Sequence, residues 1–158
     1  MNNLDTNVTG LLTEMQVQRE FIKRGFGVSV PLNPSERYDL IVDAFGGLFK
    51  VQVKTAIDLE SDDGFMIYTS SVHKKHGVWD RKCYDENEVD LFATVHNDTV
   101  YVIPYPDAGT MSQITLRTKP TKNGQEINIH YADHYELDNV IGRWNNLTDS
   151  NKQQLLIE

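Results

Sequence analysis

One stretch of the chain, residues 37–54 with the sequence RYDLIVDAFGGLFKVQVK, constrains the fold more than any other. Apolar and polar side chains alternate on both sides of a Gly-Gly pair, a pattern typical of β-strands with one buried face. Adjacent glycines also accept the positive φ angles that a tight hairpin turn requires. We therefore predict a β-hairpin whose two-residue turn is Gly46-Gly47.

This turn predicts which residues face one another across the hairpin. Asp39 lies opposite Lys54, Asp43 lies opposite Lys50, and Gln52 is diagonal to Asp39 on the same face. The other face is apolar and consists of Leu40, Val42, Ala44, Phe49, Val51 and Val53. We expect this second face to pack against the core.

The polar face has two interpretations. As a solvated surface it would hold two cross-strand ion pairs, each contributing only about 0.2–1 kcal/mol. As a site it has the groups of a metal-assisted phosphodiesterase. Mg²⁺ prefers oxygen ligands, which Asp39, Gln52 and the Val53 carbonyl can supply, and Lys54 can stabilise a pentavalent phosphorane. The hairpin residues alone leave both interpretations open.

An amphipathic helix is predicted over residues 10–24, ended by Gly25. Its predicted buried stripe is Leu11, Met15, Gln18 and Ile22, three of which are apolar, at spacings of four, three and four. Glu14 borders this stripe, where it is either an ordinary boundary glutamate or a further carboxylate oriented towards the sheet. A helix that covers the apolar face of the hairpin, rather than reaching the face of Asp39, Gln52 and Lys54, would favour the solvated interpretation.

The remaining elements indicate one α/β (α+β) domain spanning residues 1–158, with a largely antiparallel or mixed sheet. Strands are predicted at 26–30, 65–71, 90–96, 99–104, 113–116 and 126–131, a loop at 73–84, and a helix from about residue 136.

Charge is distributed unevenly along the chain. The net charge of −8 argues against a nucleic-acid-binding surface over the whole protein. Two segments are basic, however, and each has a net charge of +3: residues 72–84, with Lys74, Lys75, Arg81, Lys82 and Asp80, and residues 117–122, with Arg117, Lys119 and Lys122. These segments are either phosphate-facing or ordinary solvated loops.

The cellular compartment is inferred from what the sequence lacks. The single cysteine, Cys83, allows no internal disulfide and fits a reducing environment. No apolar run is long enough to span a bilayer, and the first ten residues do not resemble a signal peptide. We therefore expect a cytoplasmic protein.

Taken together, the ordered motifs resemble the PD-(D/E)XK nuclease superfamily, and more narrowly the intron-encoded homing endonucleases of cyanobacterial type. The resemblance covers about residues 10–140. It is carried by Glu14, by RYDLIVD and the QVKTA box at 52–56, and by a downstream box with Tyr84 and Asp90. It extends through VYVIP, ITLR and HYADHYEL. The resemblance implies a restriction-endonuclease-like core with a mixed central sheet behind an N-terminal helix.

The resemblance also implies roles for individual residues. Asp39, Gln52, Val53 and Glu14 would hold Mg²⁺, for which Mn²⁺ could substitute, and Lys54 would be catalytic together with Asp39, Gln52 and Glu14. Gln52 stands where most of the superfamily has Asp or Glu, so the site is less anionic. Tyr84 and Asp90 match the family's downstream box without an assigned role.

The implied activity is hydrolysis of a DNA phosphodiester to a 5′-phosphate and a 3′-hydroxyl. Double-stranded DNA would be contacted by Lys74, Lys75, Arg81, Lys82, Arg117 and Lys119. A chain this small would act as a homo-oligomer, either a dimer or a tetramer. Alternatives are a branched-DNA resolvase, a restriction-type nuclease, or a nuclease-derived DNA-binding module that no longer cuts.

Other chemistries have weaker support in the sequence. Neither His73-x2-His76 with Cys83 nor His130-x3-His134 has the spacing of a zinc site. Cys83 has no local signature of a nucleophile. Trp79 and Trp144 could stack on bases, although packing or interface roles are the better interpretation for both.

Overall fold

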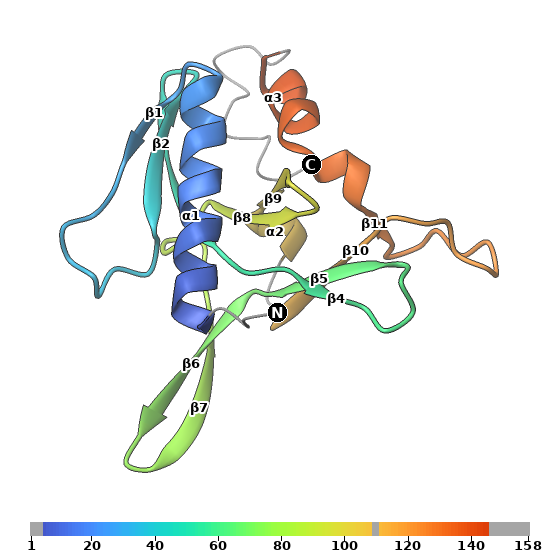
Figure 1. The fold of residues 1–158 in the computed structure, drawn as a ribbon, viewed down its shortest axis with the longest axis horizontal. Helices are drawn as coiled ribbons and strands as arrows, with labels where there is room; N and C mark the ends of the chain where they lie inside the picture. Colours follow the sequence, from blue (N-terminus) through green and yellow to red (C-terminus); the bar gives the residue numbers. More distant parts are fainter. Residues whose placement is uncertain (1–4, 109–110, 146–158) are drawn as a thin grey trace.

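The computed structural model describes residues 5–108 and 111–145 (Figure 1). In chain order its elements are α1 (Thr6–Lys23), β1 (Gly27–Ser29), β2 (Leu40–Ala44), β3 (Gly47–Val53), β4 (Ile57–Asp58), β5 (Gly64–Tyr68), β6 (Ser70–Lys75), β7 (Val78–Cys83), β8 (Leu91–His96), β9 (Thr99–Pro104), α2 (Tyr105–Ala108), β10 (Gln113–Arg117), β11 (His130–Tyr131), the 3-10 helix η1 (Ala132–Tyr135) and α3 (Leu137–Asn145).

The central sheet has the order β1-β2-β3-β8-β9. Strands β3 and β8 are parallel and the other neighbours are antiparallel, so the sheet is mixed, as predicted. Helices α1 and α3 cover one face of it (Figure 1). That face forms a cluster, the helix-side cluster, which includes Val17, Phe21, Leu40, Val42, Val51, Leu91, Leu137, Val140 and Trp144.

The opposite face of β8 and β9 packs against a second sheet with the order β11-β10-β5-β4. Phe92 and Ile103 of the central sheet meet Phe65, Ile114 and Leu116 of the second sheet in this second cluster. The hairpin β6–β7 belongs to neither sheet and projects from the body of the molecule (Figure 1). No helix in the described ranges is both long and apolar enough to cross a membrane.

The hairpin predicted from residues 37–54 is present, and its faces are as predicted, but its turn and register are shifted. The two turn residues are Phe45 and Gly46, with φ angles of 51° and 79°, and Ala44 pairs with Gly47. Asp39 therefore lies opposite Gln52 rather than Lys54, because Leu40 pairs with Val51. The turn lies one residue earlier than predicted, so the partner of each residue changes by two positions, and an even shift leaves every side chain on its predicted face.

The predicted ion pairs of this hairpin do not form. Lys50 Nζ donates a hydrogen bond to the Asn87 carbonyl at 2.8 Å instead of pairing with Asp43. Lys54 Nζ donates to the Tyr84 hydroxyl at 2.9 Å. Both lysines point to the segment between β7 and β8, which the hairpin alone could not reveal. The solvated interpretation of the polar face is therefore wrong in its specific pairs.

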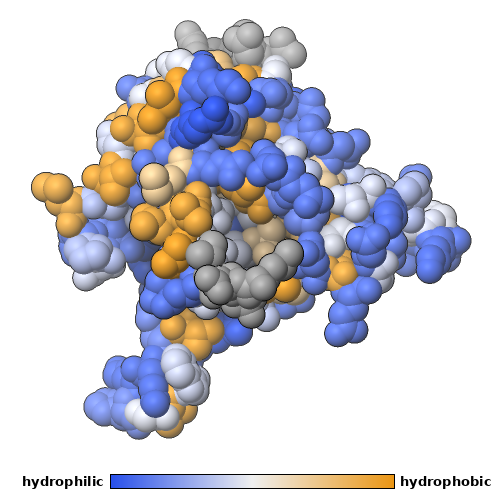
Figure 2. Space-filling view, in the orientation of Figure 1, coloured by the Kyte–Doolittle hydropathy of each residue, from blue (hydrophilic) through white to orange (hydrophobic). Residues whose placement is uncertain are grey.

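Helix α1 buries a different stripe from the predicted one. Val17 and Phe21 are fully buried, whereas Leu11, Met15 and Ile22 are each more than half exposed. The helix also begins earlier than predicted, at Thr6, where the Asp5 side chain accepts a hydrogen bond from Asn7 N–H. Apolar residues occupy two adjacent stripes of this helix, and only packing against the sheet determines which stripe is buried. Figure 2 shows the apolar surface that remains over α1.

Two further predictions of local structure are wrong. Residues 73–84, predicted as a loop, form most of the hairpin β6–β7, whose turn residues His76 and Gly77 have φ angles of 51° and 81°. This hairpin lacks a buried face beyond its first residue, so no hydrophobic alternation marks it. The strand predicted at 126–131 is reduced to β11, because Asn128 has a φ angle of 60° that interrupts an extended chain.

Candidate active site

The predicted site residues meet where β2 begins and β3 ends. Asp39 directly precedes β2, and one oxygen of its carboxylate, Oδ2, accepts hydrogen bonds from Gln52 Nε2 at 2.6 Å and from Val53 N–H at 2.8 Å. Gln52 Nε2 also lies 3.2 Å from the Val53 carbonyl oxygen. The adjacent strand β8 anchors the end of β3, because Lys54 N–H donates to the Ala93 carbonyl. Three of the predicted groups are therefore in direct contact.

Burial dominates the electrostatics of Asp39. Desolvation raises the pKa of its carboxyl above the usual range, while the Val53 N–H and the charge of Lys54 oppose the shift. A carboxylate with a raised pKa is one that a nearby cation would stabilise strongly. Its environment thus differs from that of Asp43, which lies on the same face but is exposed.

Glu14 joins this group from the helix. Burial raises the pKa of its carboxyl, and the negative charge of Asp39 adds to the effect. Helix α1 does cover the apolar face of the hairpin, as the packing of Val17 and Phe21 shows. Glu14 nevertheless lies near Asp39, because Asp39 is at the end of its strand, where a helix residue can reach beyond the sheet. The helix therefore covers the face that the solvated interpretation requires, yet Glu14 still lies close enough to Asp39 for the two charges to interact.

Lys54 has a buried and fully oriented ammonium group. Its Nζ donates to the Tyr84 hydroxyl at 2.9 Å and to the Ser70 carbonyl at 3.3 Å. Burial lowers the pKa of Lys54 to about 8, with Asp39 opposing the shift and the Arg37 charge adding to it. A lysine with this environment can carry a proton near neutral pH and release it more readily than an exposed lysine.

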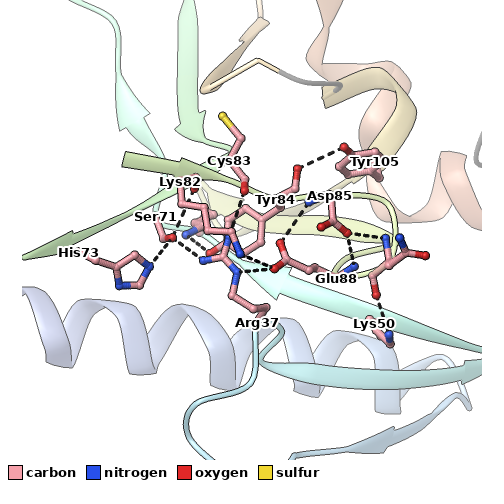
Figure 3. A network of polar contacts seen from close by, with 12 residues as sticks. Arg37, Lys50, Ser71, His73, Lys82, Cys83, Tyr84, Asp85, Glu88 and Tyr105 are labelled. Atoms are coloured by element: carbon pink, nitrogen blue, oxygen red, sulfur yellow. Dashed lines mark hydrogen bonds and ion pairs between the residues drawn. The ribbon is translucent and has the colours of Figure 1, made fainter. Parts of the chain in front are cut away.

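Arg37 is a functional candidate that the sequence interpretation missed. Its guanidinium lies 4.0 Å from the centre of the Tyr84 ring and donates to Ser71 Oγ and, at 3.2 Å, to the Cys83 carbonyl. It also lies 3.2 Å from the Glu88 carboxylate (Figure 3). Its position two residues before Asp39, inside the RYDLIVD motif, was the only signal of its proximity to the site.

The two residues of the downstream box have separate positions. Tyr84 is buried and contacts Lys54. Asp90 instead joins strands, since its Oδ2 accepts from Lys50 N–H at 2.7 Å and its own N–H donates to the Lys50 carbonyl. Tyr84 therefore belongs to the site, and Asp90 stabilises the pairing of β3 with the start of β8.

The basic residues predicted to contact DNA fall into two separate groups. Lys74, Lys75, Arg81 and Lys82 lie on the β6–β7 hairpin, whose first residue, Ser70, contacts Lys54. Arg117 and Lys119 lie at the opposite end of β10, where Arg117 pairs with Gly64 of β5. Lys119 is 2.9 Å from Asp62, and Arg117 is 3.5 Å from Asp63. Arg117 and Lys119 therefore lie at the other end of β10 from the β6–β7 hairpin, and Asp63 and Asp62 partly neutralise their charges.

The residues of the alternative chemistries are dispersed. Cys83 pairs with Ser70 at the base of the hairpin, whereas His76 is at its tip. His130 Nδ1 lies 3.0 Å from the Tyr135 hydroxyl. Trp144 is buried in the helix-side cluster, while Trp79 is 68% exposed on β7. Packing therefore accounts for Trp144 but not for Trp79.

The donor set fits a hard divalent cation. Gln52 Nε2 donates hydrogen bonds to Asp39 Oδ2 and to the Val53 carbonyl oxygen. This partly positive nitrogen marks a point at which two oxygen atoms converge, as they would around a cation. Two carboxylates, an amide and a main-chain carbonyl are oxygen ligands of the kind Mg²⁺ binds. Within residues 5–108 and 111–145 no three His, Cys, Asp or Glu residues form a metal-binding group. The fit therefore depends on Gln52 and the carbonyl as well as on Asp39 and Glu14.

Comparisons with known proteins agree with this geometry. The sequence profile of the PD-(D/E)XK endonuclease family matches residues 4–138, a range that includes all the residues gathered here. Protein 5.3 of Escherichia phage T7 is 28% identical over 103 residues, which are 65% of this chain and 83% of that protein.

A solved structure has the same fold. The bacterial homing endonuclease I-Ssp6803I superposes with a TM-score of 0.68 at 22% identity, over 92% of this chain and 100% of that chain. The predicted resemblance, with its mixed sheet behind an N-terminal helix, is therefore confirmed.

Proposed function

Because the chain belongs to the PD-(D/E)XK endonuclease family, we propose that it is a metal-dependent DNA endonuclease with its active site at Asp39, Gln52, Val53, Lys54 and Glu14. The observation that carries the proposal is the convergence of Gln52 Nε2 and Val53 N–H on one buried oxygen of Asp39, with Lys54 beside them. Two carboxyl groups and a lysine are thus held close together in a half-buried position.

The reaction is attack of water on a DNA phosphorus atom. A new P–O bond forms, the bond to the 3′-oxygen breaks, and the products are a 5′-phosphate and a 3′-hydroxyl, with the proton of water balancing the leaving alkoxide. Mg²⁺ bound by Asp39, Glu14, Gln52 and the Val53 carbonyl would supply a Lewis acid for the phosphate oxygen and lower the pKa of water.

The residues of the chain have distinct tasks in this reaction. The carboxyl groups of Asp39 and Glu14 supply the negative charge that favours a cation in a partly buried site. The Lys54 ammonium would offset the charge that develops on the phosphate oxygens in the transition state.

DNA would be held by the β6–β7 hairpin. The segment that forms it carries a net charge of +3 on a chain of −8 and has exposed side chains on both faces. Lys74, Lys75 and Arg81 would bind backbone phosphates. Lys82 would also bind a phosphate once its ion pair with Glu88 is broken. Arg117 and Lys119 would contribute less, because Asp63 and Asp62 already neutralise them.

Cleavage of both strands requires two active sites, so we also propose a homo-oligomer. Leu11, Leu12, Met15 and Ile22 leave an apolar stripe on α1 that a second copy would cover (Figure 2). Sedimentation of the protein and of a Leu11→Glu, Met15→Glu double variant tests this directly. A monomeric wild type would contradict the proposal.

A matched pair of variants tests the active site. Asp39→Ala should abolish Mg²⁺- or Mn²⁺-dependent nicking of supercoiled plasmid libraries, as should Lys54→Ala. Asp43→Ala, which changes an exposed carboxylate on the same face, should cut like the wild type. Parallel assays on linear and branched DNA distinguish a duplex endonuclease from a resolvase. DNA binding without cleavage, together with no Asp39-dependent Mg²⁺ binding in calorimetry, would indicate a binding module instead.

The DNA-binding hairpin is tested by the salt dependence of binding. Replacing Lys74, Lys75 and Arg81 with Gln should weaken DNA binding and reduce the slope of log K against log salt by about 0.9 per lost phosphate contact. The control replaces Arg117 and Lys119 with Gln, which should change that slope less. Equal effects of the two sets would show that the hairpin has no special role.

A further inference from the structure

The orientation of the catalytic lysine is determined by residues outside its own hairpin. An ammonium group has three N–H donors. Two of those on Lys54 are taken by the Tyr84 hydroxyl at 2.9 Å and the Ser70 carbonyl at 3.3 Å. One N–H is therefore left for a substrate oxygen, and the two protein acceptors fix its direction.

Tyr84 is itself immobilised. It is 6% exposed, and the edge of its ring meets Phe92 at a centroid distance of 5.5 Å. The Arg37 guanidinium lies 4.0 Å from the ring centre. Packing alone would be satisfied by phenylalanine at this position, since it would preserve both ring contacts. The hydroxyl contacts the Lys54 ammonium and the Ser71 side chain, and phenylalanine would lose both contacts.

Arg37 connects this ring to the base of the β6–β7 hairpin. It donates to Ser71 Oγ on β6 and to the Cys83 carbonyl on β7, and it pairs with Glu88, which also binds Lys82 (Figure 3). A largely buried guanidinium with three separate partners is costly to maintain for stability alone. Its partners span both strands of the hairpin proposed to bind DNA.

We propose that Tyr84 and Arg37 are positioning residues: Tyr84 orients the Lys54 ammonium, and Arg37 holds Tyr84 against the base of the DNA-binding hairpin. The inference deepens the proposed function and rests on it. It assigns no chemistry to either residue. The position of the Lys54 ammonium would then depend on the residues at the base of the β6–β7 hairpin.

Tyr84→Phe tests the first half, because it removes the hydroxyl and keeps the ring. The single-turnover cleavage rate at saturating DNA should fall roughly 10- to 100-fold, the range expected when a catalytic group is misplaced. The dissociation constant for DNA, measured in Ca²⁺, should change less than about twofold. The matched control is Tyr101→Phe, which alters another buried tyrosine of the second cluster and should leave the rate unchanged.

A second readout does not depend on cleavage. In metal-free protein near pH 6, the hydrogen-bonded Lys54 ammonium should give a resolved ¹⁵N–¹H cross peak, assigned by its loss in Lys54→Met. Tyr84→Phe should broaden or remove that peak, and Tyr101→Phe should not. A peak that persists in Tyr84→Phe, or that is absent from the wild type, overturns the inference. If no variant and no wild type cuts DNA, the proposed function fails while this measurement still judges the positioning.

Arg37→Lys tests the second half. Lysine keeps the charge but cannot reach Ser71, Cys83 and Glu88 together. The cleavage rate should fall and the Lys54 cross peak should broaden, as in Tyr84→Phe. The control is Arg24→Lys, an arginine of similar exposure that pairs with Glu20 and Asp138 away from the site. Equal effects of Arg37→Lys and Arg24→Lys would reduce Arg37 to a structural residue and overturn its assignment.

Discussion

The hairpins β2–β3 and β6–β7 have the same kind of turn but differ in how much of each is buried. Each turns through two residues with positive φ angles, Phe45-Gly46 in one and His76-Gly77 in the other. Burial alternates along β2–β3, whose apolar face packs under α1 and α3. Along β6–β7 almost every side chain is exposed. Turn residues therefore suffice to form a hairpin, whereas the contacts of its faces determine whether it is a rigid scaffold or a presented surface.

The two hairpins meet at Lys54. This lysine follows β3, and its ammonium donates to the carbonyl of Ser70, the first residue of β6. A rigid hairpin thus supplies the proposed catalytic groups, and an exposed hairpin supplies the proposed DNA contacts. The comparison predicts that substitutions in β2–β3 affect global stability, whereas those in β6–β7 affect local order and binding.

The largest expected effect is the loss of a core side chain from β2–β3. Leu40 is fully buried, so Leu40→Ala should lower the free energy of unfolding by about 2–5 kcal/mol. Val78 on β7 is 68% exposed, and Val78→Ala should change it by less than about 0.5 kcal/mol. Urea denaturation measures both. Similar costs at the two positions would remove the distinction between the hairpins.

The junction of the hairpins should be destabilised by the lysine it holds. The folded-state pKa of Lys54 is about 8, below that of an unfolded lysine, so the unfolded state binds more protons between these values. Wild-type stability should therefore rise as the pH increases from about 8 to about 10, and below pH 8 the cost is fully present.

Lys54→Met removes this cost. At pH 7 the variant should exceed the wild type in unfolding free energy by of the order of 1–3 kcal/mol, and the difference should shrink towards pH 10. Urea denaturation at pH 7, 8, 9 and 10 measures this. A variant that is less stable than the wild type at pH 7 would show that the ammonium contributes more through its hydrogen bonds than burial costs.

The two turn glycines allow the most direct comparison. A Cβ added at Gly46 or Gly77 would meet nothing within 4 Å, so the cost of Ala is conformational at both. For a positive φ angle that cost is about 1–2 kcal/mol. Gly46→Ala should show it in global urea unfolding, and Gly77→Ala only as faster amide exchange at the tip of β6–β7. A full global cost for Gly77→Ala would show that the two hairpins unfold as one unit.

The smallest effect concerns the base of the exposed hairpin. Although burial works in the opposite direction, hydrogen bonds from Lys82 and Asp85 N–H and the charge of Arg37 hold the pKa of Glu88 below its usual value. This contribution is present above the unfolded pKa and is lost as the pH falls through the folded pKa.

Glu88→Gln should therefore flatten the loss of stability below about pH 4.3, by less than about 1 kcal/mol. Acid titration of the unfolding free energy measures this effect. The control is Glu86→Gln at an exposed neighbour, which should follow the wild-type curve. Identical curves for all three proteins would mean that Glu88 contributes nothing to acid stability.

The sequence by itself determined the mixed α+β architecture and the face on which Asp39, Gln52 and Lys54 lie. Side-chain alternation has a period of two, so a register error of two residues in the pairing left the faces unchanged. The positions of β8 and β9 were also predictable, because both strands are short runs of apolar and β-branched residues joined by a turn.

Only the tertiary structure decided which stripe of α1 is buried, that residues 73–84 form a hairpin, and that Lys54 meets Tyr84 rather than Asp39. Each of these depends on contacts between segments distant in the chain, as between Lys54 and Tyr84 or between Arg37 and Glu88. Local periodicity contains no information about such contacts. An exposed hairpin has no apolar alternation to reveal it, and a helix with two apolar stripes buries the one that its neighbours cover.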